Sequence, residues 1–290
     1  MSGEDPAPTT IGDLLRQGRR ALAAVAGFEP SPREANLLLG HVLGLGEASL
    51  LARTGEAVAA DDEARFRRLL ERRLAGEPVA YLFGEREFYG RRFAVDPRVL
   101  IPRPETEHLI EAALKLDLPA PPPLILDLGT GSGAIAVTLA LEIPGARVVA
   151  ADLSLPALAV LRSNVRRHGV GDRVAAVRAD LGAALRLDRF DLVVSNPPYV
   201  DPREAAGLSP EVRDYEPHLA LFAPGAGRAV LERLLDDARA LRPGVHLLAE
   251  IGYDQSGWLR SAASSRREVE LVEIVRDYGG IPRTAVIRRR

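Results

Sequence analysis

Residues 124–140 read LILDLGTGSGAIAVTLA, with a short apolar run, three spaced glycines and a second apolar run. This pattern predicts a buried strand, a glycine loop and a helix. Gly129, Gly131 and Gly133 permit a tight turn and a close approach of the backbone to a ligand. The free N–H groups at the start of the following helix would favour a polar or anionic group.

The same alternation of strand and helix patterns continues to the end of the chain. We predict strands at 124–129, 147–153, 173–181, 190–196, 245–251, 268–277 and 284–289. Helical segments lie between most of them, for example 154–169 and 227–241. Repeated β-α-β units with nearly continuous apolar strands indicate an α/β fold, with a parallel sheet covered on both faces.

In such sheets a ligand binds at the carboxyl ends of the strands, near the point where the strand order reverses. Gly129, Asp152, Asp180 and Asn196 all fall at predicted strand ends. We therefore expect the functional site to lie at this edge of the sheet.

The glycine loop fits two cofactors. Gly129, Gly131 and Ala134 satisfy the dinucleotide pattern G-x-G-x-x-G/A, and Asp152 follows at about the 20-residue distance of a ribose-binding carboxylate. However, Asp127 would repel a pyrophosphate, whereas it would suit the ammonium group of a cationic cofactor. The loop therefore favours S-adenosylmethionine and leaves NAD open.

A second unusual segment, Asn196-Pro197-Pro198-Tyr199, follows the strand pattern at 190–196. An amide or exocyclic amine nitrogen is a poor nucleophile unless acceptors hold its hydrogens and turn its lone pair towards an electrophile. The Asn196 side chain and the Pro197 carbonyl offer two such acceptors, and proline has no N–H to compete. The prolines would hold this geometry, and Tyr199 offers a flat face for a planar group.

The first part of the chain has a different character. Helical patterns cover 10–27, with Thr10 as N-cap, and also 31–44 and 61–76, which predicts a small helical bundle. A hairpin is expected around Tyr89-Gly90 within residues 85–106. This segment ends in IPRPET, where Thr106 is expected to cap the next helix. Taken alone, it is an interdomain connector.

Two motifs together, Asp127 to Gly133 and Asn196 to Tyr199, resemble the class I S-adenosylmethionine-dependent amino-methyltransferases. The resemblance is closest to the protein-(glutamine-N5) methyltransferases of peptide chain release factors, the PrmC/HemK family. It covers nearly the whole chain and includes the connector GEREFYGRRFAVDPRVLIPRPETE at 84–107, YEPHLALF at 215–222 and RDYGGIPR at 276–283. It therefore replaces the interpretation of residues 85–106 as a mere connector.

The resemblance assigns roles to individual residues. The expected cofactor-binding residues are Asp127, Gly129, Thr130, Gly131, Ser132, Gly133, Asp152, Asp180, Leu181 and Asn196. The expected catalytic residues, which would also hold the glutamine amide, are Asn196, Pro197, Pro198 and Tyr199. The further substrate-binding residues are Phe88, Arg103, Glu105 and Thr106, with Pro104 between them. Leu181 stands where some relatives carry an aromatic residue against adenine.

The resemblance also implies the architecture and the partner. It predicts a seven-stranded, mostly parallel Rossmann-like sheet whose last strand is antiparallel. The expected domains are a helical substrate-recognition domain at 1–84, a hairpin and connector at 85–106, and a catalytic domain at 107–290. The expected substrate is the glutamine of the Gly-Gly-Gln loop in class 1 release factors, with no metal ion.

The sequence also bears on three other function classes. A nucleic-acid amino-methyltransferase would use the same tetrapeptide on adenine N6 or cytosine N4, but the net charge of −2 offers no basic surface. An NAD-dependent oxidoreductase leaves Asn196 to Tyr199 unexplained, and a non-enzymatic binding module would not need both motifs. With no cysteine, no signal peptide and no apolar run of about 20 residues, we expect a cytoplasmic monomer that contacts neither membrane nor nucleic acid.

Overall fold

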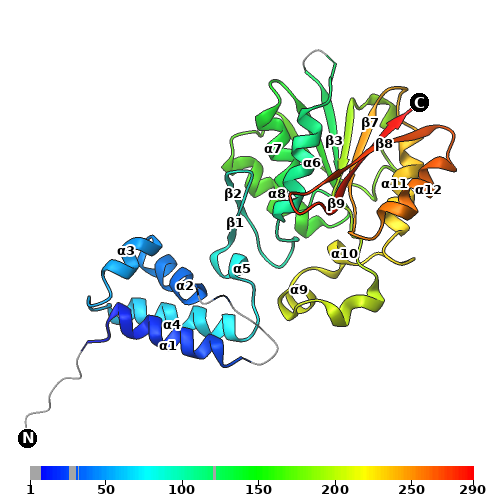
Figure 1. Ribbon diagram of the computed structural model, residues 1–290. Coiled ribbons are helices and arrows are strands. Elements are labelled where there is room, and N and C mark those ends of the chain that lie inside the picture. The colour runs from blue at the N-terminus through cyan, green and yellow to red at the C-terminus, as the bar shows by residue number, and fades with distance from the viewer. Residues whose placement is uncertain (1–7, 26–30, 32, 120–121) are drawn as a thin grey trace, which may run out of the picture. The chain divides into compact units, whose positions relative to one another are not determined.

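The computed structural model describes residues 8–25, 31, 33–119 and 122–290, which form two compact units (Figure 1). The first unit contains the described residues up to Phe83 together with Ser209–Tyr215. The second contains Gly84–Leu208 and Glu216–Arg290. No sequence pattern indicated that the short segment Ser209–Tyr215 belongs with the first unit.

The first unit is helical. Its helices are α1 (Ile11–Ala23), α2 (Glu34–Leu43), α3 (Glu47–Ala52), α4 (Ala60–Leu74), α5 (Val79–Phe83) and α9 (Pro210–Tyr215). Thr10 caps α1 as expected, because its side chain accepts from the Asp13 backbone N–H at 3.2 Å while Asp13 accepts from the Thr10 N–H. The predicted end of the first helix, at residue 27, lies outside the described residues, and α3, α5 and α9 were not predicted.

A buried arginine connects three helices of this unit. The Arg73 side chain on α4 is 3% exposed, and it pairs with Glu34 of α2 at 2.6 Å and with Glu211 of α9 at 3.0 Å. The Tyr215 hydroxyl also donates to the Ala75 carbonyl at 2.7 Å. The segment 209–215 is thus held by charge and by a hydrogen bond against the end of α4.

The second unit is built on a seven-stranded sheet in the order β5-β4-β3-β6-β7-β9-β8. The strands are β3 (Leu124–Leu128), β4 (Arg147–Asp152), β5 (Val174–Arg178), β6 (Leu192–Ser195), β7 (His246–Glu250), β8 (Val269–Arg276) and β9 (Pro282–Arg289). Pairing is parallel from β5 to β7, and β9 runs antiparallel between β7 and β8. The predicted α/β class and the antiparallel last strand are confirmed.

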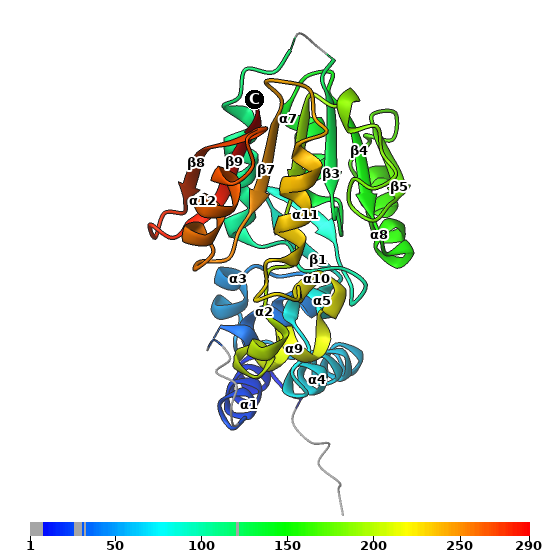
Figure 2. The ribbon, with the colours of Figure 1, turned by 90° about the vertical axis from the view of Figure 1, so that its right-hand side faces the viewer.

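Helices cover both faces of the sheet (Figure 2). One face packs against α6 (Glu107–Leu114), α7 (Ala134–Glu142) and α8 (Leu155–Arg167). The other packs against α11 (Ala229–Ala238) and α12 (Ser256–Ser264). Along β3, Leu126 and Leu128 enter the second core, so Asp127 points to the first face, towards α7.

The order of the strands places a crevice between β3 and β6. The chain passes from β3 to β4 on one side and later returns to β6 on the other side. At such a reversal the connections leave in opposite directions and open a space at the carboxyl ends of the two strands. The glycine loop and Asn196 flank this space.

The hairpin predicted before the sheet is present as β1 (Glu85–Phe88) and β2 (Arg91–Ala94). Tyr89 and Gly90 form its two-residue turn, and both have positive φ, at 50° and 68°. This is the type I′ turn, whose twist matches that of the flanking strands. Phe88 and Phe93 are buried side by side in an edge-to-face arrangement with ring centroids 6.1 Å apart.

Residues 200–226, for which the sequence predicted no elements, hold short helical turns. Besides α9, these are η3 (Pro202–Gly207) and α10 (His218–Leu221), while η1 (Pro104–Thr106) and η2 (Leu187–Arg189) lie elsewhere in the second unit. Val200 forms an isolated parallel bridge with Phe222, which closes this excursion at its base.

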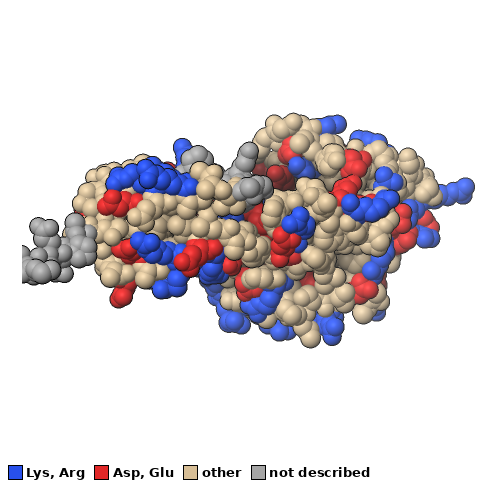
Figure 3. Space-filling view, turned by 90° about the horizontal axis from the view of Figure 1, so that it is seen from below, with Lys and Arg blue, Asp and Glu red and all other residues tan. Residues whose placement is uncertain are grey.

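Charges of both signs are interspersed on the surface drawn in Figure 3. Many arginines have an acidic partner close in sequence, such as Glu56 for Arg53 and Glu63 for Arg67, each pair 2.6 Å apart. Within the described ranges, no helix has both the length and the apolar character needed to cross a bilayer.

Candidate functional site

The glycine loop turns directly from β3 into α7. Its first part is fixed by hydrogen bonds from the Gly129 and Thr130 N–H groups to the Ala151 carbonyl, at 2.9 and 3.0 Å. Gly131 has φ +55°, and no atom lies within 4 Å of the position that a Cβ would take. The backbone there is left-handed and open on one side, as a loop that receives a ligand requires.

Asp127 lies beneath this loop and is fully buried. Its Oδ2 accepts a hydrogen bond from the Thr130 hydroxyl at 2.6 Å, while its Oδ1 has no hydrogen bond of ordinary geometry among the described residues; the Ala136 backbone N–H is near enough to lower the pKa of the carboxyl slightly. Burial raises the pKa of Asp127 to about 7, opposed by the Thr130 hydrogen bond and reinforced by the nearby Asp152. A buried carboxylate with one unpaired oxygen is suited to a cationic or N–H-bearing ligand.

Asp152 ends β4 and connects two segments around the loop. Its Oδ2 accepts from the Gly131 N–H at 2.9 Å and its Oδ1 from the Ser154 N–H at 2.8 Å. Ser154 in turn caps α8 by accepting from the Ala157 N–H at 3.2 Å. The carboxylate is therefore held in place and remains partly exposed to the crevice.

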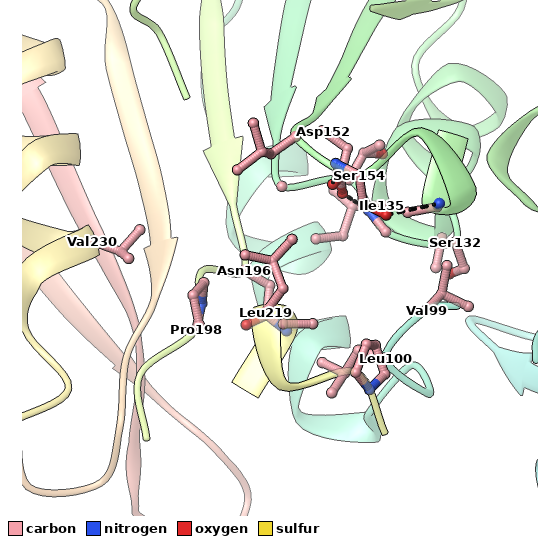
Figure 4. Close-up of a pocket in the computed structure, with 18 of the residues that line it drawn as sticks. Val99, Leu100, Ser132, Ile135, Asp152, Ser154, Asn196, Pro198, Leu219 and Val230 are labelled. Atoms are coloured by element: carbon pink, nitrogen blue, oxygen red, sulfur yellow. Dashed lines mark hydrogen bonds between the residues drawn. The ribbon is translucent and has the colours of Figure 1, made fainter. Parts of the chain in front are cut away.

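A cavity of about 340 Å³ occupies the crevice (Figure 4). Figure 4 shows Asp152 and Ser154 on one side, and Asn196, Pro198 and Leu219 on another. The predicted site residues that line it are Phe88, Thr106, Gly129, Thr130, Gly131, Ser132, Asp152, Asp180, Leu181, Asn196 and Pro198. The remaining ones, Asp127, Gly133, Pro197, Tyr199, Arg103 and Glu105, lie outside its lining.

Other lining residues were not predicted. The connector contributes Val99, Leu100 and Pro102, and the 217–233 region contributes, among others, Leu219 and Arg233. The apolar VLIP stretch at 99–102 was the only sequence signal for the first group. Residues from 217–233 reach the cavity because the chain folds back after η3, and no local pattern announces that return.

The Asp180-Leu181 pair follows β5 and carries an unusual backbone. Leu181 has φ 51°, in the left-handed region that non-glycine residues rarely adopt. Asp180 pairs with Arg233 of α11 at 2.9 Å, and about half of each side chain is exposed. This corner thus brings a carboxylate, an arginine and a strained backbone to one side of the cavity.

Asn196 belongs to a short hydrogen-bond chain. Its Nδ2 donates to the Thr106 hydroxyl at 3.0 Å, and that hydroxyl donates to Glu250 Oε2 at 2.6 Å. Thr106 therefore does not cap α6 with its side chain, and that expectation was wrong, because the hydroxyl is committed to Asn196 and Glu250. Burial raises the pKa of Glu250 to about 7, while the Thr106 hydrogen bond and the Arg283 charge oppose the rise.

Tyr199 faces the same carboxylate. Its hydroxyl lies 3.4 Å from Glu250 Oε1, and burial together with the Glu250 charge raises the pKa of the phenol. Its carbonyl oxygen would be only 2.0 Å from a Cβ at Gly227, so a glycine is required there. Arg103 contacts the buried Glu216, which also accepts from the Ile101 N–H at 3.2 Å.

Comparison with known proteins gives the family. Residues 13–84 match the model of the PrmC N-terminal domain, and residues 111–209 match that of the methyltransferase small domain. The release factor glutamine methyltransferase of Nitratidesulfovibrio vulgaris is 43% identical over 291 residues, which cover 98% of each chain. The chain belongs to the release factor glutamine methyltransferase family. The resemblance drawn from the sequence is thereby confirmed.

Other members of the family match nearly as extensively. The release factor glutamine methyltransferase of Bordetella pertussis is 46% identical over 254 residues, covering 86% of this chain and 92% of the relative. That of Moorella thermoacetica is 40% identical over 282 residues, covering 97% of this chain and 99% of the relative. Both parts of the chain, helical and α/β, are thus shared with the family.

Solved structures support the fold. A methyltransferase from Pyrococcus furiosus matches with a TM-score of 0.50 and 17% identity, over 78% of this chain and 98% of that chain. The hMettl16 catalytic domain matches with a TM-score of 0.53 and 18% identity, over 68% of this chain and 74% of that chain. At these identities the likeness concerns the methyltransferase fold alone.

Proposed function

We propose that this protein methylates the side-chain amide nitrogen (N5) of the glutamine in the Gly-Gly-Gln loop of class 1 peptide chain release factors. S-adenosyl-L-methionine is the methyl donor and S-adenosyl-L-homocysteine the product. The proposal is supported by family membership at 40–46% identity. The structural observation that carries it is the Asn196 amide, placed in one cavity with the open glycine loop.

The residues around the loop fit this cofactor. The cavity volume of about 340 Å³ is within the range of small-molecule sites. Asp127 offers a buried unpaired oxygen to the ammonium group, and Gly129 to Gly133 wrap the amino-acid part. Asp152 binds the ribose, and Asp180 with Leu181 lies against the adenine. When bound, the cofactor supplies an electrophilic methyl group on a sulfonium sulfur.

On the substrate side, Asn196 Oδ1 and the Pro197 carbonyl accept the two N–H hydrogens of the glutamine amide. This turns the nitrogen lone pair towards the methyl carbon. The bound cofactor would supply the methyl carbon for the new C–N bond, and its sulfur would keep the electron pair of the broken C–S bond. The methylated nitrogen then releases one proton to solvent, and the amide is restored. Pro197 and Pro198 hold these acceptors so that little reorganisation is needed.

The two expected domains have separate tasks in this proposal. Residues 1–84 recognise the body of the release factor, while 107–290 carry the cofactor and the amide site. Phe88, Arg103, Glu105 and Thr106 of the 85–106 connector close the site. Among these, Thr106 contacts Asn196 directly, whereas Phe88 is 1% exposed and also packs in the core.

The test is transfer of a labelled methyl group to a purified class 1 release factor, followed by mapping of the label by mass spectrometry. We expect label on the loop glutamine and none on a release factor in which that glutamine is alanine. Asn196→Ala should reduce kcat at least about 100-fold, with cofactor affinity changed far less.

Three outcomes would contradict parts of the proposal. Label on nucleic acid and not on the release factor would indicate the alternative function, methylation of adenine N6 or cytosine N4. Cofactor binding without transfer to any release factor would remove the substrate assignment. An equal loss of cofactor affinity and turnover in Asn196→Ala would make Asn196 a cofactor residue and not a substrate residue.

A further inference from the structure

Three side chains from distant parts of the second unit form one hydrogen-bond chain beside the cavity. Asn196 follows β6, Thr106 ends η1 and Glu250 ends β7. Thr106 is 4% exposed and Glu250 1% exposed, so neither exchanges these bonds freely with water. The distances are 3.0 Å from Asn196 Nδ2 to Thr106 Oγ1 and 2.6 Å from Thr106 Oγ1 to Glu250 Oε2.

The direction of this chain follows from the number of hydrogens available. An ionised carboxylate can only accept, so the single hydrogen of the Thr106 hydroxyl points to Glu250. The Thr106 oxygen can then only accept from its other neighbour. The edge of the Asn196 amide that faces Thr106 must therefore be the NH₂ group, and Oδ1 is turned away from Thr106.

We propose that Glu250 and Thr106 are positioning residues, which hold the Asn196 amide in the one orientation that presents Oδ1 to the substrate nitrogen. This inference rests on the proposed function, because it explains how the acceptor for the glutamine N–H is kept from turning over. If the Asn196 amide were inverted, its NH₂ group would face the N–H of the substrate glutamine. Two donors cannot form a hydrogen bond, so the substrate amide would not be held.

The same geometry makes the orientation depend on pH. Burial raises the pKa of Glu250 to about 7. A protonated Glu250 can donate to Thr106, which frees the Thr106 hydrogen for Asn196 and allows the amide to invert. The groups that face Glu250 are Tyr199 at 3.4 Å, Arg283, which favours the charged form, and Glu105, which opposes it. Turnover should therefore fall as the pH is lowered through about 7.

Conservative substitutions separate positioning from folding. Thr106→Val removes the hydroxyl at nearly constant shape, Thr106→Ser retains it, and Glu250→Gln removes the charge. We expect Thr106→Val and Glu250→Gln to lower kcat by about 10–100-fold, with the cofactor Kd changed less than about 2-fold. Thr106→Ser should recover most of the loss. Thr138→Val is the matched control, because Thr138 is a fully buried threonine in α7 whose hydroxyl has no partner among the described residues.

A second readout does not depend on any substrate. The chain has three asparagines and two glutamines, so the side-chain NH₂ signals of ¹⁵N-labelled protein are few. The Asn196 NH₂ signal should exchange slowly with water in the native protein and much faster in Thr106→Val. It should also shift with a midpoint near pH 7 that Glu250→Gln abolishes.

The results divide clearly. Unchanged kcat in both Thr106→Val and Glu250→Gln would overturn the positioning role. If Glu250→Gln does not fold, the comparison of Thr106→Val with Thr106→Ser decides. Absence of release-factor methylation by the native protein would refute the proposed function, while the NMR readout would still report on the hydrogen-bond chain.

Discussion

Asp127 shows how a single residue near the site opposes the stability of the fold. It is buried in the α7 face of the sheet, yet only one of its oxygens is hydrogen-bonded within the described part of the chain. Burial disfavours its charged form, so its pKa rises to about 7. The folded protein therefore holds a proton on Asp127 over a pH range in which the unfolded chain has released it.

Asp127→Asn should remove this effect. Between about pH 4 and pH 7 the folded state binds more protons than the unfolded state, so the contribution of Asp127 to the free energy of unfolding decreases as the pH rises. The variant lacks that decrease. The free energy of unfolding of the variant, minus that of the native protein, should therefore increase by roughly 1–3 kcal/mol from pH 5 to pH 8. Urea unfolding at the two pH values measures this difference.

The exposed Asp172→Asn is the control for the loss of a negative charge, and its stability difference should be similar at the two pH values. Asp127→Asn should also bind S-adenosylmethionine more weakly, because the amide cannot pair with an ammonium group. A stability difference that stays constant between pH 5 and pH 8 would show that Asp127 is ionised in the folded protein throughout this range.

At the scale of elements, one side chain joins the hairpin to the glycine loop. Asn164 on α8 is fully buried, and its Oδ1 accepts from the Ala94 N–H of β2 at 2.7 Å. Its Nδ2 donates to the carbonyls of Ala94 at 3.0 Å and Ser132 at 2.8 Å. All hydrogens of this amide are used, so the position of β2 is tied to that of the loop.

Asn164→Ala should destabilise the second unit by about 3 kcal/mol, because it leaves buried backbone groups of Ala94 and Ser132 without partners. Asn164→Asp should be at least as harmful at pH 8, since it places a carboxylate against two carbonyl oxygens. The exposed neighbour Ser163→Ala serves as control and should change the free energy of unfolding by less than about 0.5 kcal/mol. Thermal unfolding measures all three, and equal stability of Asn164→Ala and Ser163→Ala would refute the link.

The elements differ in how far the sequence predicts them. The strands, the glycine loop and the hairpin follow from local periodicity and turn residues, and the sequence predicts each of them, whereas the order of the strands within the sheet was not predicted. The contacts of Thr106 with Asn196 and Glu250 join residues 90 and 144 positions apart, so no local pattern reveals them. For the same reason the cavity-lining residues Leu219 and Arg233 were missed.

At the scale of the whole molecule, the chain forms two units, and its single tryptophan lies in only one of them. Trp258 is the single tryptophan of the chain and lies on α12 in the second unit. Its fluorescence therefore reports the unfolding of that unit. Hydrogen exchange on α1, α2 and α4 reports the first unit, so the two can be followed in the same sample.

Arg73→Met should act mainly on the first unit. It leaves Glu34 and Glu211 without their shared buried cation, which should cost about 3 kcal/mol. The matched control is Arg72→Met, because Arg72 is half exposed and pairs with Glu77, and its loss should cost less than about 1 kcal/mol. In Arg73→Met we expect faster hydrogen exchange at the backbone amides of α1, α2 and α4. The unfolding transition followed by Trp258 fluorescence should shift less than the unfolding of these helices. If hydrogen exchange and Trp258 fluorescence report the same loss of stability, the two units unfold together.

The placement of Ser209–Tyr215 also limits how the chain can be divided. Because this segment belongs to the first unit while its flanks belong to the second, the backbone passes between the units three times. A fragment ending at Phe83 lacks Glu211 and Tyr215, and the complementary fragment carries α9 without Arg73 or Ala75 to receive it. No single cut separates the two units completely, so an N-terminal fragment that holds all described residues of the first unit must also carry Gly84–Leu208 of the second.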